Sequence, residues 1–280
     1  MSNQISSMTD NQLIDDLVKY SPASGQEILR KDFANDIHRY RRIFELIPDG
    51  GDSKSLLDIG ARLYTASIFC NNLHYQKVSL ATKWKSSYTG DDIIAAIPNS
   101  DRIDISYFDA EKDVFPYADN TFDVVICSEI IEHLAIDPMH MMAEINRVTR
   151  LNGLLLITTP NAASFDAIKR LLAGQHPYSW SPYNGSSTDR HNREYTINEL
   201  EKLQKPSGFD VVHSETFSKH PFTLKDKVLA RWISLLDIAR GKPGLNFDRL
   251  GNTSLILAQK KSSVQDRFPA WLYYDAMKGR

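Results

Sequence analysis

Residues 103–134 read IDISYFDAEKDVFPYADNTFDVVICSEIIEHL, and they carry the clearest indication of the fold class. It contains two short apolar runs, 103–108 and 122–127, each followed by polar residues. Runs with so little apolar–polar alternation suit strands that are covered on both faces. Comparable runs lie outward from it at 55–59 and 154–158, with helical patterns between the runs. This order predicts an α/β fold with a mostly parallel sheet and helices on both faces.

Helical patterns surround these strands. A capping box at Thr9–Gln12 opens one predicted helix, and a second is predicted over 26–46. Two further helices are predicted to begin at Asp137 and at the capping box 196–199, and two more are predicted over 164–173 and 223–240. Closing strands are predicted over 209–212 and 254–258. We therefore divide the chain into a helical extension (1–53), a core (54–218), a helical insertion or cap (219–252) and a last strand with its tail (253–280).

Composition narrows the class of protein. The 280 residues have a formal net charge of −2 and no long basic run, which argues against a strong sequence-independent grip on nucleic acid. Cys70 and Cys127 form no Cys-x-x-Cys pair, so no thiolate zinc site or disulfide framework is expected. The first residues are polar and no apolar stretch is long enough to span a membrane, so we expect a cytoplasmic protein.

Polar or small residues follow the predicted strands at four places. They are Asp58–Ala61, Asp109–Glu111, Cys127–Glu129 and Thr158–Asn161. In an open parallel sheet, ligands bind beyond the carboxyl ends of the strands, near the point where the strand order reverses. These four segments are therefore the expected binding site.

Three of these stretches resemble a known family. SLLDIGA (55–61), the segment 107–134 and GLLLITTPN (153–161) are similar to strand motifs of class I S-adenosylmethionine-dependent methyltransferases, types 11 and 23. The resemblance covers about residues 54–215. It implies a Rossmann-like, mostly parallel sheet of seven strands, S-adenosyl-L-methionine as cofactor, and methyl transfer.

The resemblance also implies roles for individual residues. Asp58, Gly60 and Ala61 would lie at the methionine end of the cofactor, where a missing side chain lets the backbone approach the ligand. The remaining assignments are Asp109 and Ala110 to the adenine, Ser128 and Glu129 to the methionine part and the transferring methyl group, and Asp92 to the ribose.

The sequence departs from the family pattern in the first loop. The usual Gly-x-Gly-x-Gly is here Gly60-Ala61-Arg62-Leu63-Tyr64, which retains only the first glycine. Arg62 and Tyr64 would intrude where the backbone normally approaches the ligand. Either the loop follows another path, or cofactor binding is weakened or lost.

A second departure concerns the acid that holds the ribose hydroxyls. Simple counting places it near 77–82, where there is no carboxylate. We favour an insertion that makes 87–93 the second strand, with Asp92, or else Asp91, as the ribose acid. The alternative is that 90–92 is a turn whose charges are solvated.

A further group of residues could bind metal or move protons. Glu129, Glu132, His133 and His191 are similar in spacing to the metal ligands of small-RNA 3′-terminal 2′-O-methyltransferases, which would imply Mg²⁺ or Mn²⁺. The alternative, which our assignment adopts, is that no metal binds. Many metal-free relatives carry Glu-His at this place, and Glu132, His133 and His191 are then the catalytic candidates, with an imidazole as general base.

The segments 189–196 (DRHNREYT) and 267–273 (RFPAWLY) resemble methyltransferases of glycan and glycoconjugate biosynthesis. We therefore expect O-methylation of a small molecule or a saccharide hydroxyl. An inactive methyltransferase-like scaffold and a metal-dependent RNA 2′-O-methyltransferase are the alternatives, although the charge makes nucleic acid an unfavoured partner. The apolar face of 223–240 is expected to pack as a core or cap face, with a lid or a homodimer contact as the alternative.

Overall fold

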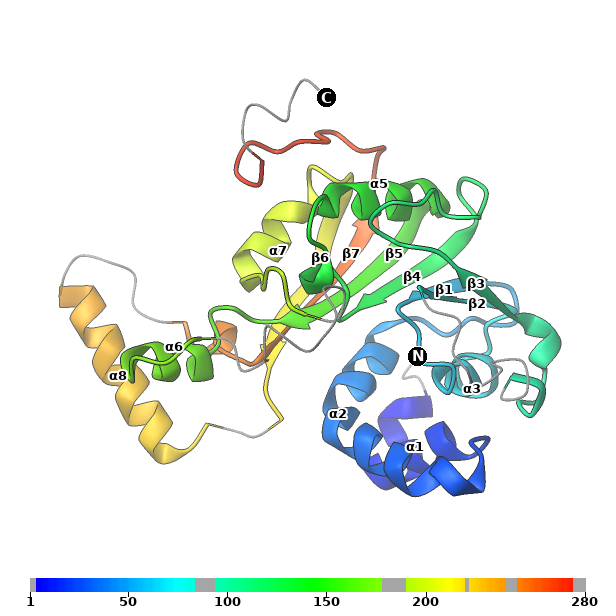
Figure 1. Ribbon diagram of the computed structural model, residues 1–280, viewed down its shortest axis with the longest axis horizontal. Helices are drawn as coiled ribbons and strands as arrows, with labels where there is room; N and C mark the ends of the chain where they lie inside the picture. The colour runs from blue at the N-terminus through cyan, green and yellow to red at the C-terminus, as the bar shows by residue number, and fades with distance from the viewer. Residues whose placement is uncertain (1–3, 84–93, 178–189, 220–221, 240–245, 274–280) are drawn as a thin grey trace.

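The computed structural model describes residues 4–83, 94–177, 190–219, 222–239 and 246–273. Its central feature is a seven-stranded sheet in the order β3-β2-β1-β4-β5-β7-β6 (Figure 1). The strands are β1 Ser55–Ile59, β2 Lys77–Thr82, β3 Ile103–Tyr107, β4 Phe122–Ser128, β5 Thr149–Pro160, β6 Phe209–Phe217 and β7 Thr253–Lys260. Strands β1 to β5 are parallel, and β7 is antiparallel to both β5 and β6.

The predicted fold class is confirmed, and six strands lie where the apolar runs predicted them. The assignment of the second strand to 87–93 is wrong. Strand β2 is Lys77–Thr82, which pairs with β1 and β3, and Val78 and Leu80 are fully buried there. Residues 77–82 pair with a strand on each side, and their central side chains are buried. These features make the segment a strand although it lacks the carboxylate expected there. Asp91 and Asp92 lie outside the described residues.

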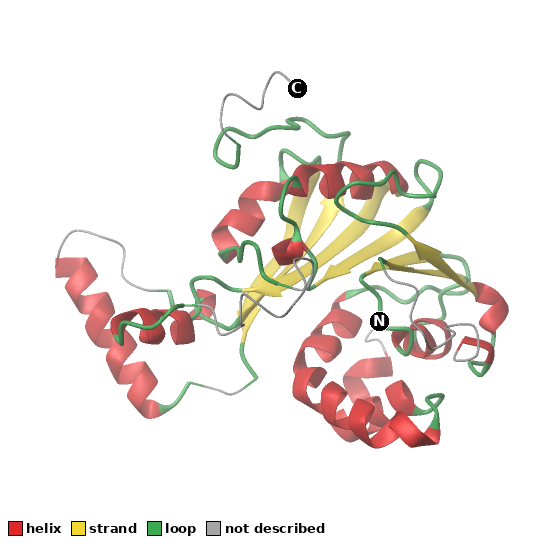
Figure 2. Cartoon of the chain, viewed as in Figure 1, coloured by secondary structure: helices red, strands yellow, loops and turns green. Residues whose placement is uncertain are grey.

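Helices cover both faces of the sheet (Figure 2). On one face lie α1 (Asp10–Val18), α2 (Gln26–Leu46) and the short α3 (Thr65–Ser67), which continues as a π-helical turn over Ile68–Asn72. The Thr9 capping box is present. The buried side chains of this layer, including those of Leu13, Phe33 and Phe44, pack with those of Leu56 and Val124 on the sheet.

The opposite face is covered by α5 (Pro138–Val148) and α7 (Ile197–Gln204). Asp137 caps α5 by accepting from the His140 amide, and Thr196 forms the predicted capping box of α7. The tail returns to this layer, where the Tyr273 hydroxyl accepts from the Met139 amide at 3.1 Å. The layer packs against buried side chains of β4 and β5, including those of Val125 and Leu155.

Helices α6 (Phe165–Leu172) and α8 (Leu224–Ala239) lie together beyond one end of the sheet (Figure 1). The expected core packing of the apolar face of α8 is wrong, since Leu224 is 78% and Trp232 65% exposed. Short 3-10 turns occupy Gln4–Ser7, Ala23–Gly25, Ser100–Arg102, Ile131–His133 and Phe247–Arg249. None of the helices in the described ranges has the length and apolar character needed to cross a membrane.

Candidate functional site

Three connected cavities lie along the carboxyl ends of the parallel strands. The inner cavity, about 190 Å³, lies between α2 and β1 and includes Arg39 and Asp58 in its lining. The β3 cavity, about 640 Å³, adjoins it at Gly60 and Glu129. The outer cavity, about 680 Å³, shares Arg39 and Glu129 with the inner one. Glu129 lines all three cavities, and we refer to these adjoining cavities together as the cleft. The two larger ones have the size that small ligands occupy.

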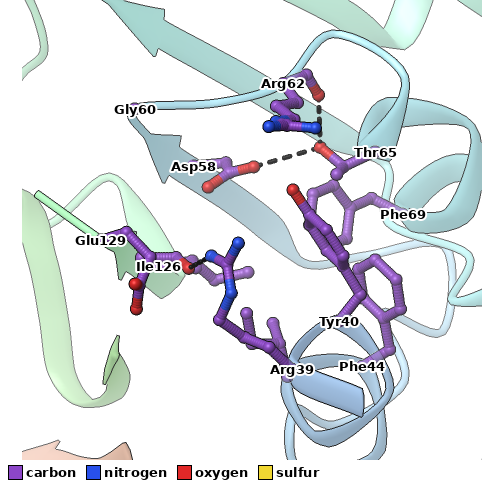
Figure 3. Close-up of a pocket in the computed structure, with 12 residues that line it drawn as sticks. Arg39, Tyr40, Phe44, Asp58, Gly60, Arg62, Thr65, Phe69, Ile126 and Glu129 are labelled. Carbon is purple, nitrogen blue, oxygen red and sulfur yellow. Dashed lines mark hydrogen bonds between the residues drawn. The ribbon is translucent and has the colours of Figure 1, made fainter. Parts of the chain in front are cut away.

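Asp58 forms one wall of the inner cavity (Figure 3). The side chain is at the end of β1 and accepts a hydrogen bond from Thr65 Oγ1 at 3.1 Å. Burial raises the pKa of Asp58 to about 7, although the Thr65 hydrogen bond and the Arg39 charge act in the opposite direction. A cationic group entering the cavity would favour the ionised carboxylate.

Arg39 faces Asp58 across the inner cavity and was not among the predicted site residues (Figure 3). It lies on α2, its side chain is 13% exposed, and its guanidinium pairs with Asp36 at 3.0 Å and donates to Ser128 Oγ at 2.8 Å. Burial alone would lower the pKa of Arg39, but the Glu129 charge, together with other neighbours, raises it overall. Arg39 is therefore a cation held among carboxylates.

Gly60 sits where β1 ends, and it needs to be a glycine for two reasons. Its φ of +76° is in the left-handed region, and a Cβ would lie 2.1 Å from Ile130 Cδ1. The amides of Gly60 and Ala61 both donate to the Ala81 carbonyl, at 2.9 and 3.1 Å. The first part of the loop is thus tied to the end of β2.

The bulky residues of this loop turn toward the helical layer. The Tyr64 ring packs edge-on against the Phe33 ring, with centroids 6.3 Å apart. The Arg62 guanidinium lies 5.7 Å from the centroid of the same ring and borders the inner and outer cavities. Tyr64 therefore packs away from the cavities, whereas Arg62 forms part of the lining of two of them.

The lining of the β3 cavity combines apolar side chains with charged ones, among them Asp109, Glu111 and Lys112. Asp109 pairs with Lys83 at 2.8 Å, and its Oδ1 accepts from the Glu111 amide at 3.0 Å. Burial opposes ionisation, but Lys83 and this amide lower the pKa of Asp109 below its usual value. Ala110 lines the same cavity, whose apolar walls include Phe108, Ile130 and Leu134. A flat apolar ring with an amino group would suit this space.

The outer cavity brings Glu132, His133 and His191 together, with one ligand atom of each within 4.8 Å of the others. Glu132 is fully buried, and its Oε2 accepts from Thr159 Oγ1 at 2.8 Å. Burial, and then the Glu129 charge, raise the pKa of Glu132 well above its usual value. The rings of His133 and His191 pack edge to face, with their centroids 5.0 Å apart.

Glu129 does not join this cluster, although the sequence grouped it with the other three. Its φ of +57° turns the chain directly after β4. Its Oε1 accepts from Thr158 Oγ1 at 2.9 Å, and its amide donates to the Thr158 carbonyl. Ser128 Oγ lies 2.8 Å from the same hydroxyl. Glu129 is therefore the residue shared by the three cavities, and Ser128 beside it lines the inner one.

The fold is an α/β sheet with cavities at the ends of its parallel strands, which is where open α/β sheets bind their ligands. A family model described as a methyltransferase domain matches residues 28–214, more than half of the chain. The chain therefore belongs to the S-adenosylmethionine-dependent methyltransferase family, and the resemblance found in the sequence is confirmed.

Individual relatives match the chain at low sequence identity and over less than half of its length. The chain is 26% identical over 114 residues to a ubiquinone biosynthesis O-methyltransferase of Roseobacter denitrificans, covering 41% of this chain and 44% of that protein. It is 32% identical over 110 residues to a probable S-adenosylmethionine-dependent methyltransferase of Mycolicibacterium smegmatis, covering 39% and 36%. Each match thus spans less than half of the curated relative. An S-adenosylmethionine-dependent methyltransferase structure from Mesorhizobium loti superposes with a TM-score of 0.53 at 16% identity, covering 82% and 99%.

Proposed function

We propose that the chain transfers a methyl group from S-adenosyl-L-methionine to a hydroxyl of a small molecule or a saccharide. The cleft of three adjoining cavities at the ends of β1, β3 and β4 is the observation that carries this proposal. Its residues match the cofactor in kind. Arg39 offers a cation for the methionine carboxylate, Asp58 offers a carboxylate for the ammonium group, and the slot at Asp109 offers an acceptor for the adenine amine.

When bound, the cofactor supplies an electrophilic methyl group on a sulfonium ion. An in-line approach of the acceptor is required, so positioning provides much of the rate. Glu129 borders all three cavities of the cleft, which makes its surroundings the natural meeting point of methyl group and acceptor. Glu132, His133 and His191 then lie on the acceptor side and are our candidates for the residues that take part in removing the hydroxyl proton.

An oxygen acceptor is supported by two observations. The cluster that lines the outer cavity provides imidazoles and a carboxylate, which a hydroxyl nucleophile needs more than an amine does. Two curated relatives, from Roseobacter denitrificans and Parvibaculum lavamentivorans, are O-methyltransferases. The saccharide form of the acceptor rests on the 189–196 and 267–273 resemblances alone.

The decisive experiment has two stages. Calorimetry with the full chain should detect S-adenosylmethionine and S-adenosylhomocysteine binding, and no binding at millimolar cofactor would favour the inactive scaffold. Transfer of a radiolabelled methyl group is then measured against panels of phenols, saccharides and RNA oligonucleotides. Product in the first two panels, with a loss of turnover in His191→Ala that exceeds its loss of stability, supports the proposal. Product with RNA alone would replace it with the RNA alternative.

A further inference from the structure

One side of α8 exposes a row of apolar side chains, which we call the α8 stripe. Its five members are 54–78% exposed, and they are Leu224, Val228, Trp232, Leu235 and Ile238. With 3.6 residues per turn, these positions fall within a band of about 120° around the helix. The band is about 21 Å long at a rise of 1.5 Å per residue. An exposed apolar surface of this kind marks an interaction site in many soluble domains.

The other side of α8 attaches the helix to the rest of the chain. Ala230 is fully buried in a small apolar cluster with Phe165 of α6 and with Leu250. Asp226 pairs with Lys169 of α6 at 3.1 Å. Ala230 and Asp226 lie opposite the α8 stripe on the helix, so the stripe faces away from α6, at the outer edge of the molecule (Figure 1).

The charges on the exposed side of α8 are positive. Lys225, Lys227 and Arg231 are exposed and lie beside or within the α8 stripe. In the part of the chain that the structure describes, none of these three cations pairs with a carboxylate. The acidic side chain that is described on α8, Asp226, is only 18% exposed and is engaged by Lys169. The outward face of the helix therefore combines apolar side chains with unpaired cations.

We propose that the α8 stripe binds the surface of an anionic lipid bilayer, with α8 lying in the plane of that surface. An apolar face that contains Trp and Leu and is bordered by Lys and Arg is typical of helices that bind membranes in this way. Each cation close to an anionic surface strengthens binding about fivefold. A second copy of this chain is a poorer occupant, because two such faces would bring like charges together.

The α8 stripe lies next to the acceptor side of the cleft. Asp166, Lys169 and Arg170 of α6 line the outer cavity, and Lys169 also contacts Asp226 of α8. A single helix, about 10 Å across, therefore separates α8 from the outer cavity. This arrangement favours an amphiphilic acceptor, whose apolar tail stays in the bilayer while its hydroxyl enters the outer cavity. That assignment of the acceptor rests on the proposed function, whereas binding to the bilayer does not.

Vesicle flotation tests the docking without any methyl transfer. The full chain is mixed with vesicles of phosphatidylcholine alone, or of equal parts of phosphatidylcholine and phosphatidylglycerol. We expect binding to the mixed vesicles to be at least about tenfold tighter, and to weaken as salt is added. Brominated acyl chains should quench the tryptophan fluorescence of the wild-type chain. Trp232→Phe, which keeps an aromatic ring on the helix, should remove most of that quenching.

Two double variants then assign the face. Trp232→Ser with Leu235→Ser should weaken binding to the mixed vesicles at least about tenfold. Lys227→Gln with Arg231→Gln should weaken it about 25-fold, at about fivefold per cation. Ile28→Ser is the matched control, because Ile28 on α2 is 66% exposed, as Trp232 is at 65%. It should leave vesicle binding unchanged.

Three results would overturn the docking. They are no binding of the wild-type chain to the mixed vesicles, binding that both double variants leave intact, and a dimer in sedimentation that Trp232→Ser with Leu235→Ser converts to monomers. The last result would assign the α8 stripe to a second copy of this chain.

Methyl transfer then tests the amphiphilic acceptor. It is measured to a phenol and a glucoside with long alkyl chains in mixed vesicles, and to phenol and glucose in solution. On the alkylated acceptors, wild type should be at least about tenfold faster than Trp232→Ser with Leu235→Ser, as their vesicle affinities differ. Equal rates would overturn the membrane-borne acceptor. Vesicle binding with no transfer to any of these acceptors counts against the proposed function alone, and transfer without vesicle binding counts against the docking alone.

Discussion

Arg39 on α2 donates a hydrogen bond to Ser128 Oγ at the end of β4, at 2.8 Å and across 89 residues of chain. This contact joins the N-terminal helices to the sheet inside the cleft. It keeps the guanidinium beside Asp58 and Glu129, whose charges both interact with it. The N-terminal helices are thus a wall of the site as well as a cover for one face of the sheet.

Replacing Arg39 by Ala should weaken S-adenosylmethionine binding by about 10- to 100-fold, because a charge-assisted hydrogen bond to a carboxylate contributes roughly 1.5–3 kcal/mol. Calorimetry measures the change. Arg42→Ala is the control on the same helix, since Arg42 pairs with Glu215 and lines none of the three cavities. Equal losses in both variants would mean that Arg39 acts through folding alone.

Asp109, in the β3 cavity, should affect binding of the adenine part of the cofactor. We expect Asp109→Ala to weaken binding of adenosine, S-adenosylmethionine and S-adenosylhomocysteine alike, by about tenfold or more, because each contains the adenine amine. Arg39→Ala should leave adenosine affinity unchanged, since adenosine has no carboxylate. If folded Asp109→Ala binds adenosine as tightly as wild type, the β3 cavity is not the adenine site.

Cofactor affinity should rise with pH around neutrality. The pKa of Asp58 is raised to about 7 in the folded chain without ligand, and an ammonium group binds only the ionised carboxylate. Below pH 7 the proton must leave on binding, so affinity should fall by up to about tenfold per pH unit there. Calorimetry in buffers of different ionisation enthalpy would detect the released proton. A pH-independent affinity between pH 6 and 8 would contradict this role of Asp58.

The raised pKa of Asp58 also predicts how the stability of the folded chain depends on pH. The folded pKa of Asp58, about 7, exceeds the ordinary 3.8, so the folded chain binds the proton more tightly than the unfolded chain. The stabilisation is complete below pH 4 and is lost as pH rises to 7. Asp58→Asn removes this dependence and should raise the melting temperature at pH 8 while weakening cofactor binding. A lower melting temperature at pH 8 would show that the charged carboxylate is stabilising.

Gly60→Ala should destabilise the chain by about 1–2 kcal/mol for the left-handed φ alone, with an added cost for the contact with Ile130. Shortening Ile130 to Ala in the same chain removes the contact and leaves the backbone strain. The double variant should therefore recover part of the loss, and a double-mutant cycle from urea unfolding measures that part. Full recovery would mean that the positive φ contributes nothing.

Much of the fold could be predicted because its signals are local. The bounds of β1 and α2 coincide with the expected ranges, since a buried run and an amphipathic stretch each end at turn-forming or helix-breaking residues. Strand β2 was misassigned because the family pattern places a carboxylate after the second strand, and residues 77–82 contain none. Its buried Val78 and Leu80 were the better guide.

The site was harder to predict, because it depends on distance in space. Asp58 and Asp109 follow strand ends and could be found by motif. Arg39 follows no strand, and its only local signal is a charged side chain at the edge of the apolar face of α2. Glu129 does not join Glu132 in the cluster, because the chain makes a left-handed turn at Glu129. Spacing along the chain does not reveal such a turn.

The contribution of α2 to the cleft also has a consequence for synthesis. At about 5–20 residues per second, the ribosome needs roughly 5–20 s to add the 89 residues that separate Arg39 from its partner on β4. During that interval the apolar side chains of α1 and α2 are outside the exit tunnel, and the strands that bury them in the folded chain are incomplete. Newly made chains should therefore depend on nascent-chain chaperones at this stage, and the pocket can close only after β4 has emerged.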